Sequence, residues 1–285
     1  MSFKVGYLGP AATFTHLAVT KYFEDEAEQI PFLNIPKCID AVAAGEIDVA
    51  VVPLENALEG SVNLTVDYLV HEQPLPIVGE IVAPIQQHLL VHPQREHCWE
   101  ETEKVYSHSH AIAQCHKFLH RELPDAAYEN ATSTGAAAKY IQEHPEEKVA
   151  AIANELAAEE YGLKMVRKDI HDYPHNHTRF AVLHPDKAAS FRTNLRKVTD
   201  RTTLMITLPS DQSGALHQVL SAFSWRKLNL SKIESRPMKT GLGNYFFIVD
   251  IDMQLDEVLI PGATAELEAL GCGVRILGTY SAYAI

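Results

Sequence analysis

The sequence predicts an α/β protein with two domains, a larger one over residues 1–190 and a smaller one over residues 200–285. A chain of 285 residues has the length expected of two domains. In the larger domain, short apolar runs alternate with longer helical patterns, which predicts a mostly parallel sheet covered by helices. The smaller domain follows the order β-α-β-β-α-β, which is the ferredoxin-like arrangement.

The larger domain begins with a predicted strand, Phe3–Leu8, which a Gly-Pro pair ends before a helix over Thr13–Phe23. A second strand, Asp48–Pro53, is apolar at consecutive positions and precedes a helix over Val62–Val70. Three more strand–helix pairs follow, at residues 105–106 and 111–119, 127–128 and 135–142, and 149–153 and 155–161. Strands that are apolar on both faces are typical of sheets covered by helices on both sides.

Two segments predict that this domain has two lobes. Ile77–Val91 is a long apolar stretch interrupted by Pro84, and it can carry the chain from one lobe to the other. Arg179–Leu183 is a later strand that can return the chain to the first lobe. The sequence therefore predicts a cleft between two lobes.

The smaller domain follows a polar connection over residues 186–200. Its predicted elements are, in order, a strand over Thr202–Leu208, a helix over Gly214–Trp225, a strand over Leu228–Ser235, a turn over Lys239–Gly243, a strand over Tyr245–Ile251, a helix over Ala263–Leu270 and a strand over Val274–Tyr280. Two strand–helix–strand units of this kind form one four-stranded sheet with two helices on one face.

The composition excludes several classes of protein. A formal net charge of −13 argues against nucleic acid or an anionic membrane as a partner. The sequence has no run of about 18 apolar residues and no secretory signal, so we expect a cytoplasmic protein with no membrane span. The four cysteines are scattered, so we expect reduced thiols rather than disulfides. An anionic ligand would need a locally positive pocket.

Hydroxyl side chains recur where predicted strands of the larger domain give way to helices. They are Thr13, Thr15, Ser61, Ser107, Ser109, Ser133 and Thr134. Each alone fits a helix N-cap. Together they lie beyond the carboxyl ends of strands, where α/β proteins bind ligands and where helix N-termini attract anions. The residues alone therefore predict a small-anion site between the lobes.

The segment from His171 to Phe180 is the densest polar cluster of the chain, with three histidines. No acidic or cysteine ligand stands at a usual zinc spacing elsewhere, so we expect no metal and no cofactor. Arg179 suits a bidentate grip on a carboxylate, although an ordinary surface salt bridge explains it equally well. No nucleotide-binding or hydrolase motif appears in a supporting context. The substrate does not follow from these residues.

Several segments nevertheless resemble the successive signatures of prephenate dehydratases. They are Gly9-Pro10 with Thr13-Phe14-Thr15-His16, Pro53-Leu54-Glu55-Asn56 with Glu59-Gly60-Ser61-Val62, Ser133-Thr134 with Ala136-Ala137-Ala138, and Asn176-His177-Thr178-Arg179-Phe180. The match is ordered and spans nearly the whole chain. The sequence departs from the family at Ala12, where Gly is common, and at Ser107-His108-Ser109-His110, where the family has Ser-His-Pro-Gln.

The resemblance implies a two-lobed, periplasmic-binding-protein-like catalytic domain that converts prephenate to phenylpyruvate, carbon dioxide and water. Thr178 matches the catalytic hydroxyl of the family, and we expect it to donate a hydrogen bond to the departing oxygen. Glu55 either assists protonation or is a structural carboxylate. The positions that match the family's substrate pocket are Thr13, Asn56, Ser107, Gln114, Ser133, Thr134, Arg179 and Phe180. Strict strand alternation would point Arg179 away from Thr178 and Phe180.

The smaller domain resembles the ACT domain attached to these enzymes, which implies feedback regulation by phenylalanine. The resemblance rests on Gly214-Ala215-Leu216-His217 and Glu234-Ser235-Arg236-Pro237. The effector site that it implies consists of Gly214, Ala215, Leu216, His217, Asn229, Leu230, Glu234, Ser235 and Arg236. Such domains usually pair, so we expect a homodimer or homotetramer.

Three alternatives concern the exact activity. Because no chorismate-mutase-like segment precedes Met1, we expect a monofunctional enzyme. Arogenate, which differs from prephenate by an amino group, is a rival substrate that the sequence does not exclude. A non-catalytic amino-acid sensor is the alternative from another class, and the intact Thr178-Arg179-Phe180 segment argues against it.

Overall fold

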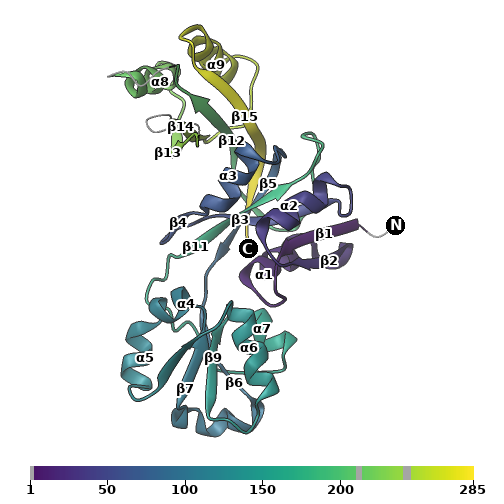
Figure 1. The fold of residues 1–285 in the computed structure, drawn as a ribbon, viewed down its shortest axis with the longest axis vertical. Helices are drawn as coiled ribbons and strands as arrows, with labels where there is room; N and C mark the ends of the chain where they lie inside the picture. Colours follow the sequence, from purple (N-terminus) through teal and green to yellow (C-terminus); the bar gives the residue numbers. More distant parts are fainter. Residues whose placement is uncertain (1–2, 210–213, 240–244) are drawn as a thin grey trace.

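The computed structural model describes residues 3–209, 214–239 and 245–285. Figure 1 shows an elongated molecule with three stacked parts: a lower lobe, a central lobe and the C-terminal domain at the top. Among the described residues, the central lobe and the C-terminal domain share one ten-stranded sheet, and the lower lobe has a five-stranded sheet. The predicted α/β class and the two lobes are confirmed.

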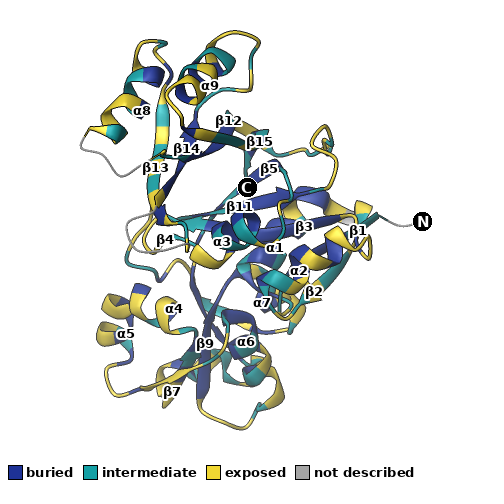
Figure 2. Cartoon of the chain, turned by 45° about the horizontal axis from the view of Figure 1, so that its top comes forward, coloured by how far each residue is buried: buried dark blue, intermediate teal, exposed yellow. Residues whose placement is uncertain are grey.

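The central lobe contains the five strands β5-β11-β3-β1-β2 of the large sheet, with β4 beside β3. Its elements are β1 (Phe3–Leu8), α1 (Phe14–Phe23), a 3-10 turn (Glu24–Glu26), β2 (Ala27–Phe32), α2 (Ile35–Ala43), β3 (Val49–Asn56), β4 (Gly60–Ser61), α3 (Asn63–His71), β5 (Ile77–Pro84) and β11 (His177–Leu183). Val49, Ala50, Val51 and Val52 are all fully buried, as expected for a strand covered on both faces. Figure 2 shows this central sheet in dark blue, with exposed residues on the surrounding helices.

The lower lobe lies between the two crossings that the sequence predicts. Its elements are β6 (His88–Val91), a 3-10 segment (Pro93–Glu101), β7 (Lys104–Ser107), α4 (Ser109–Gln114), α5 (His116–Glu122), β8 (Ala127–Asn130), α6 (Thr134–Glu143), β9 (Val149–Ala153), α7 (Glu155–Glu160) and β10 (Lys164–Arg167). The chain enters the lower lobe after Pro84, between β5 and β6. It returns to the central lobe through β11, which pairs with both β3 and β5.

The prediction of a mostly parallel sheet is only half right. β1 runs parallel to β2 and β3, and β7 runs parallel to β8 and β9. The strands on either side of the two crossings are antiparallel, because β11 returns beside β3 and β5 and β6 pairs with β9 and β10. Both sheets are therefore mixed.

The C-terminal domain has the predicted βαββαβ order. Its elements are β12 (Arg196–Thr207), α8 (Ala215–Ser224), β13 (Leu230–Pro237), β14 (Tyr245–Ile251), α9 (Leu259–Ala269) and β15 (Gly273–Ala284). The strand order is β13-β14-β12-β15, and both helices pack on one apolar core that includes Phe223, Val249 and Leu267. Of the turn predicted over residues 239–243, only Lys239 lies within the described residues.

The two domains are joined more closely than the sequence suggests. β15 pairs with β5 in parallel, so the sheet continues from the C-terminal domain into the central lobe. At this junction Gly278 is required, because a Cβ there would lie 2.1 Å from the carbonyl oxygen of Ile77. β12 begins at Arg196, inside the connection that we predicted over residues 186–200. A shared core adds to the junction, with Met205 and Tyr280 packed among residues of the central lobe.

Candidate active site

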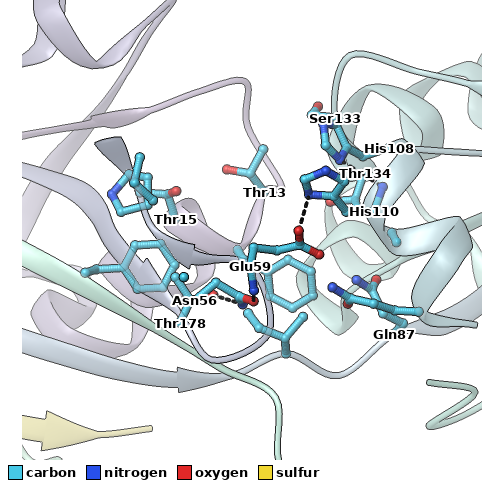
Figure 3. Close-up of a pocket in the computed structure, with 18 of the residues that line it drawn as sticks. Thr13, Thr15, Asn56, Glu59, Gln87, His108, His110, Ser133, Thr134 and Thr178 are labelled. Carbon is cyan, nitrogen blue, oxygen red and sulfur yellow. Dashed lines mark hydrogen bonds and ion pairs between the residues drawn. The ribbon is translucent and has the colours of Figure 1, made fainter. Parts of the chain in front are cut away.

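A cavity of about 520 Å³ lies between the central and lower lobes (Figure 3). Both lobes line it, with residues from the β1–α1 and β3–β4 loops on one side and from α4 and the start of α6 on the other. Its lining residues are Thr13, Phe14, Thr15, Pro53, Asn56, Glu59, Gly60, Ser61, Val62, Ile85, Gln87, His108, His110, Ala111, Gln114, Thr132, Ser133, Thr134, Thr178 and Phe180.

Most of the predicted site residues meet in this cavity. Seven of the ten that we assigned to catalysis or substrate binding line it: Thr13, Asn56, Gln114, Ser133, Thr134, Thr178 and Phe180. The other three, Glu55, Ser107 and Arg179, do not. The seven come from positions as far apart as 13 and 180, so the fold gathers them from the whole larger domain.

Thr178 and Asn56 form the polar centre of the cavity. They lie opposite each other in the pairing of β11 with β3, and the Asn56 Nδ2 donates to the Thr178 Oγ1 at 2.9 Å. The amide orientation is fixed by its other end, where Oδ1 accepts from the backbone N–H groups of Leu58 and Glu59 at 3.0 and 3.1 Å. Because the Thr178 oxygen already accepts a hydrogen bond, its own hydrogen is available to donate.

Two helices begin at the cavity. Thr13 caps α1 by accepting from the His16 N–H at 3.3 Å, and Ser133 caps α6 by accepting from the Ala136 N–H at 3.0 Å. Helix N-termini carry partial positive charge and free N–H groups, so they favour anions. Gly135 lets the two helix starts approach, because a Cβ there would lie 2.4 Å from the carbonyl oxygen of Ala11.

Ala12 lies in the same loop and has a φ of 62°. This is the left-handed region that favours glycine, which explains why a glycine suits this position.

The lower lobe contributes amide side chains. Gln114 is buried, and its Oε1 accepts from the Asn176 Nδ2 at 3.2 Å. The Oε1 of Gln87, at the same wall, is buried and has no hydrogen-bond partner within the described residues. A buried acceptor of this kind favours a ligand that brings a donor.

A histidine–carboxylate contact, which is an ion pair when His110 is protonated, joins the two lobes beside the cavity, as Figure 3 shows. His110 from α4 lies 3.7 Å from the Glu59 carboxylate of the β3–β4 loop, which connects the two lobes. Burial is the main reason why the pKa of His108 is below its ordinary value, and the nearby His110 lowers it further. His108 is therefore mostly neutral at pH 7. Sequence reasoning missed Glu59, Gln87, His108 and His110. The Ser107-His108-Ser109-His110 segment was the available signal for the two histidines.

Arg179 and Glu55 do not lie in the cavity, where the sequence-based prediction placed them. Alternation along β11 points Arg179 to the face opposite Thr178, as the strand rule predicts. There its guanidinium bonds Glu55 at 2.6 Å, Glu80 at 2.7 Å and Asp250 at 2.8 Å. Lys232 holds the other oxygen of Glu55 at 3.2 Å. Arg179 therefore binds carboxylates of the protein, and Glu55 has no contact with the cavity.

Ser107 is the third residue that the structure places outside the cavity. It ends β7, is fully buried, and its Oγ donates to the Ile152 carbonyl at 2.6 Å. The hydroxyl joins two strands of the lower lobe instead of facing the ligand space.

The predicted effector residues lie on α8 and β13 of the C-terminal domain. Gly214 precedes α8 with a φ of 87°, and Ala215, Leu216 and His217 form its first turn. The Asn229 Nδ2 donates to Asp252 at 2.7 Å, and Leu230 begins β13. Residues 210–213, next to this motif, lie outside the described residues.

Two effector-motif side chains contact the central lobe in this structure. Arg236 bonds Asp67 of α3 at 2.7 Å, and it also bonds Asn63. Glu234 bonds Ser61. Burial opposes the ionisation of Glu234, but hydrogen bonds from Ser61 and Arg236 outweigh it and hold its pKa below the ordinary value. Ser235 lies between them on β13.

Known proteins resemble this chain along its length. Residues 5–188 match the family model described as Prephenate dehydratase. A prephenate dehydratase of Bacillus subtilis (strain 168) is 67% identical over 283 residues, which cover 98% of this chain and 99% of that protein.

The chain belongs to the prephenate dehydratase family.

Other prephenate dehydratases agree. That of Lactococcus lactis subsp. cremoris (strain MG1363) is 40% identical, with 99% of each chain covered. A crystal structure of the Arthrobacter aurescens enzyme in complex with L-Phe has a TM-score of 0.85 at 36% identity, covering 97% of this chain and 89% of that one. The Staphylococcus aureus enzyme has a TM-score of 0.82, also at 36% identity, covering 98% and 100%. The predicted family, enzyme class and dehydratase function are confirmed.

Two further observations concern partners. None of the described helices is long and apolar enough to cross a membrane. Within residues 3–209, 214–239 and 245–285, no three side chains of His, Cys, Asp and Glu gather in a way that could hold a metal ion.

Proposed function

We propose that the cavity between the lobes is the active site for the decarboxylating dehydration of prephenate to phenylpyruvate. The observation that carries this proposal is the hydrogen bond from Asn56 to Thr178, which leaves the Thr178 hydrogen free beside the cavity. A hydroxyl that is free to donate can stabilise a leaving oxygen by a hydrogen bond. A protein that only binds its ligand does not need such a donor. The non-catalytic sensor is therefore not favoured.

The substrate brings two carboxylates, one keto group and one ring hydroxyl. None of the described side chains that line the cavity is Lys or Arg, so the helix starts at Thr13 and Ser133 supply the positive potential. The buried Gln87 oxygen can accept from the ring hydroxyl, which is the one donor of prephenate. Arogenate carries an ammonium in place of the keto group, and Glu59, the one carboxylate among the described lining residues, is already in contact with His110. We therefore propose prephenate rather than arogenate as the preferred substrate.

In the reaction, the bond between the ring carbon and its carboxylate breaks and carbon dioxide leaves. The released electron pair makes the ring aromatic, and the carbon–oxygen bond to the ring hydroxyl breaks at the opposite position. Negative charge develops on the departing oxygen, and Thr178 stabilises it by donating a hydrogen bond. The departing hydroxide needs one proton to become water. The titratable side chains that line the cavity are Glu59, His108 and His110, and Glu55 is not among them.

The C-terminal domain supplies regulation in this proposal. The Arthrobacter aurescens relative was crystallised with L-Phe, and the Gly214–His217 and Glu234–Pro237 segments resemble the phenylalanine-binding signatures of ACT domains. We place phenylalanine at these segments, between two paired copies of the domain in a homodimer or homotetramer. The enzyme works in the cytoplasm.

The experiment is phenylpyruvate formation from prephenate by the purified full chain, with and without phenylalanine, and in a separate assay phenylalanine formation from arogenate. We expect turnover of prephenate with a higher kcat/KM than that of arogenate, and we expect phenylalanine to change it. Binding of prephenate without turnover, by a folded protein, would instead support the sensor.

A further inference from the structure

Lys232 of β13 lies between the predicted effector motif and the edge of the cavity. Its ammonium is 2.6 Å from the Ser61 Oγ, 3.2 Å from the Glu55 Oε1 and 3.3 Å from the Glu234 Oε2. Its side chain is 11% exposed, so all three contacts are shielded from solvent. Ser61 lines the cavity, whereas Glu234 belongs to the motif assigned to phenylalanine. One cation of the C-terminal domain thus joins both sites.

A continuous path leads from Lys232 to the catalytic hydroxyl. Glu55 receives Lys232 on one oxygen and Arg179 on the other, at 3.2 and 2.6 Å. In the pairing of β3 with β11, Glu55 lies opposite Arg179 and Asn56 lies opposite Thr178. A displacement of the Glu55–Arg179 pair can therefore be passed to the adjacent Asn56–Thr178 pair, because each pair consists of neighbours along the same two strands.

The ammonium of Lys232 also contacts Ser61, which lines the cavity. Ser61 donates to Glu234 and accepts from Lys232, so its hydroxyl is held by two side chains of the C-terminal domain, while its backbone pairs with Glu55 of β3. An effector that binds at Glu234 has to change these contacts, because Glu234 is already shared by Ser61, Lys232 and Arg236.

We propose that Lys232 is a positioning residue for the dehydration, acting through Glu55 and Ser61, and that it transmits effector binding at Glu234–Arg236 to Thr178. The effector half of this proposal rests on the proposed function. The C-terminal domain therefore completes the active site in addition to regulating it. A misplacement of a catalytic group by about 1 Å can cost roughly a hundredfold in rate, so a small shift along this path suffices.

The test is Lys232→Met in the full chain, with kcat, KM, the phenylalanine response and calorimetric phenylalanine binding measured together. We expect kcat to fall about tenfold or more, KM to change less than kcat, and the phenylalanine response to fall to less than half while phenylalanine still binds. Lys232→Arg keeps the charge and restores most of the response. In a double variant with Glu55→Gln, the two losses in kcat do not multiply, because both changes break the same path.

The matched control is Lys239→Met. Lys239 also joins the C-terminal domain to a carboxylate of the central lobe, Asp67 at 2.9 Å, but its side chain is 55% exposed and, among the described residues, it forms no ion pair with one that lines the cavity. We expect wild-type kcat and phenylalanine response for this variant. Wild-type kcat and a full response in Lys232→Met would overturn the proposal, as would equal losses in the control.

A second variant covers the case in which Lys232→Met does not fold. Ser61→Ala removes only the hydroxyl that Lys232 and Glu234 hold, and it too weakens the phenylalanine response; an unchanged response refutes the path through Ser61. Failure of the wild type to turn over prephenate or to bind phenylalanine would instead refute the proposed function, and the same assays report it separately.

Discussion

Replacing Thr178 by valine tests the role of its hydroxyl with little change of shape. The variant keeps a β-branched side chain on β11 and removes the hydrogen that, in the proposed mechanism, is donated to the departing oxygen. Deleting one preorganised donor of this kind costs about 3 kcal/mol in the barrier, which is roughly a hundredfold in kcat. We expect kcat to fall by at least this factor and KM to change much less, because the hydrogen bond strengthens as charge develops.

The cost to stability is smaller and can be read from the partners of Asn56. Without the Thr178 oxygen, the Asn56 Nδ2 still has the His177 carbonyl at 3.3 Å, and its Oδ1 keeps both backbone N–H donors. We therefore expect a loss of about 1 kcal/mol in the free energy of unfolding. Such a loss leaves the protein folded, because domains are stable by about 5–15 kcal/mol.

The assay is phenylpyruvate formation over a range of prephenate concentrations, with urea unfolding of each variant. Thr178→Ser keeps the hydroxyl and serves as the control, with kcat expected within about tenfold of wild type. If Thr178→Val retained wild-type kcat, or if the serine variant lost as much as the valine variant, the hydroxyl would have no role in the chemistry.

Three other predictions follow from the structure. Arg179→Met should lower the free energy of unfolding in urea by about 3–5 kcal/mol, because Arg201 still binds Glu80 at 2.5 Å but lies 4.0 Å from the buried Asp250 carboxylate, which loses its close cation; a loss below 1 kcal/mol would contradict this. Arg236→Ala should abolish the phenylalanine response of turnover, and an unaltered response would place the effector elsewhere. Burial lowers the pKa of His88, so its contribution to stability is full above pH about 6.5 and is lost as the pH falls below that value; His88→Gln should flatten this pH dependence, and an unchanged slope would refute it.

Elements with strong local signals could be predicted from the sequence. The bounds of β1, β9 and β14 agree with the prediction, because each is an apolar run that ends at a change of composition. β2 and α2 were missed, since β2 is an edge strand that mixes polar and apolar residues. The single helix predicted over residues 111–119 is two helices that meet at Cys115, whose φ of −115° is not helical.

Features that depend on distant partners could not be predicted. β12 and β15 extend beyond the C-terminal domain because β15 pairs with β5, and this pairing leaves no mark in the composition. Alternation indicated that Arg179 points away from Thr178, but its partners Glu80 and Asp250 are 99 and 71 residues away along the chain. Thr13 and Ser133 were found because capping hydroxyls have a local signature, whereas Gln87 has none.

The most direct test of the account is the turnover of prephenate by wild type and Thr178→Val, measured side by side as phenylpyruvate released by folded protein. The account predicts turnover by the wild type and a loss of about a hundredfold or more in kcat for the variant. A wild type that binds prephenate without releasing phenylpyruvate, or a variant as active as the wild type, would contradict it.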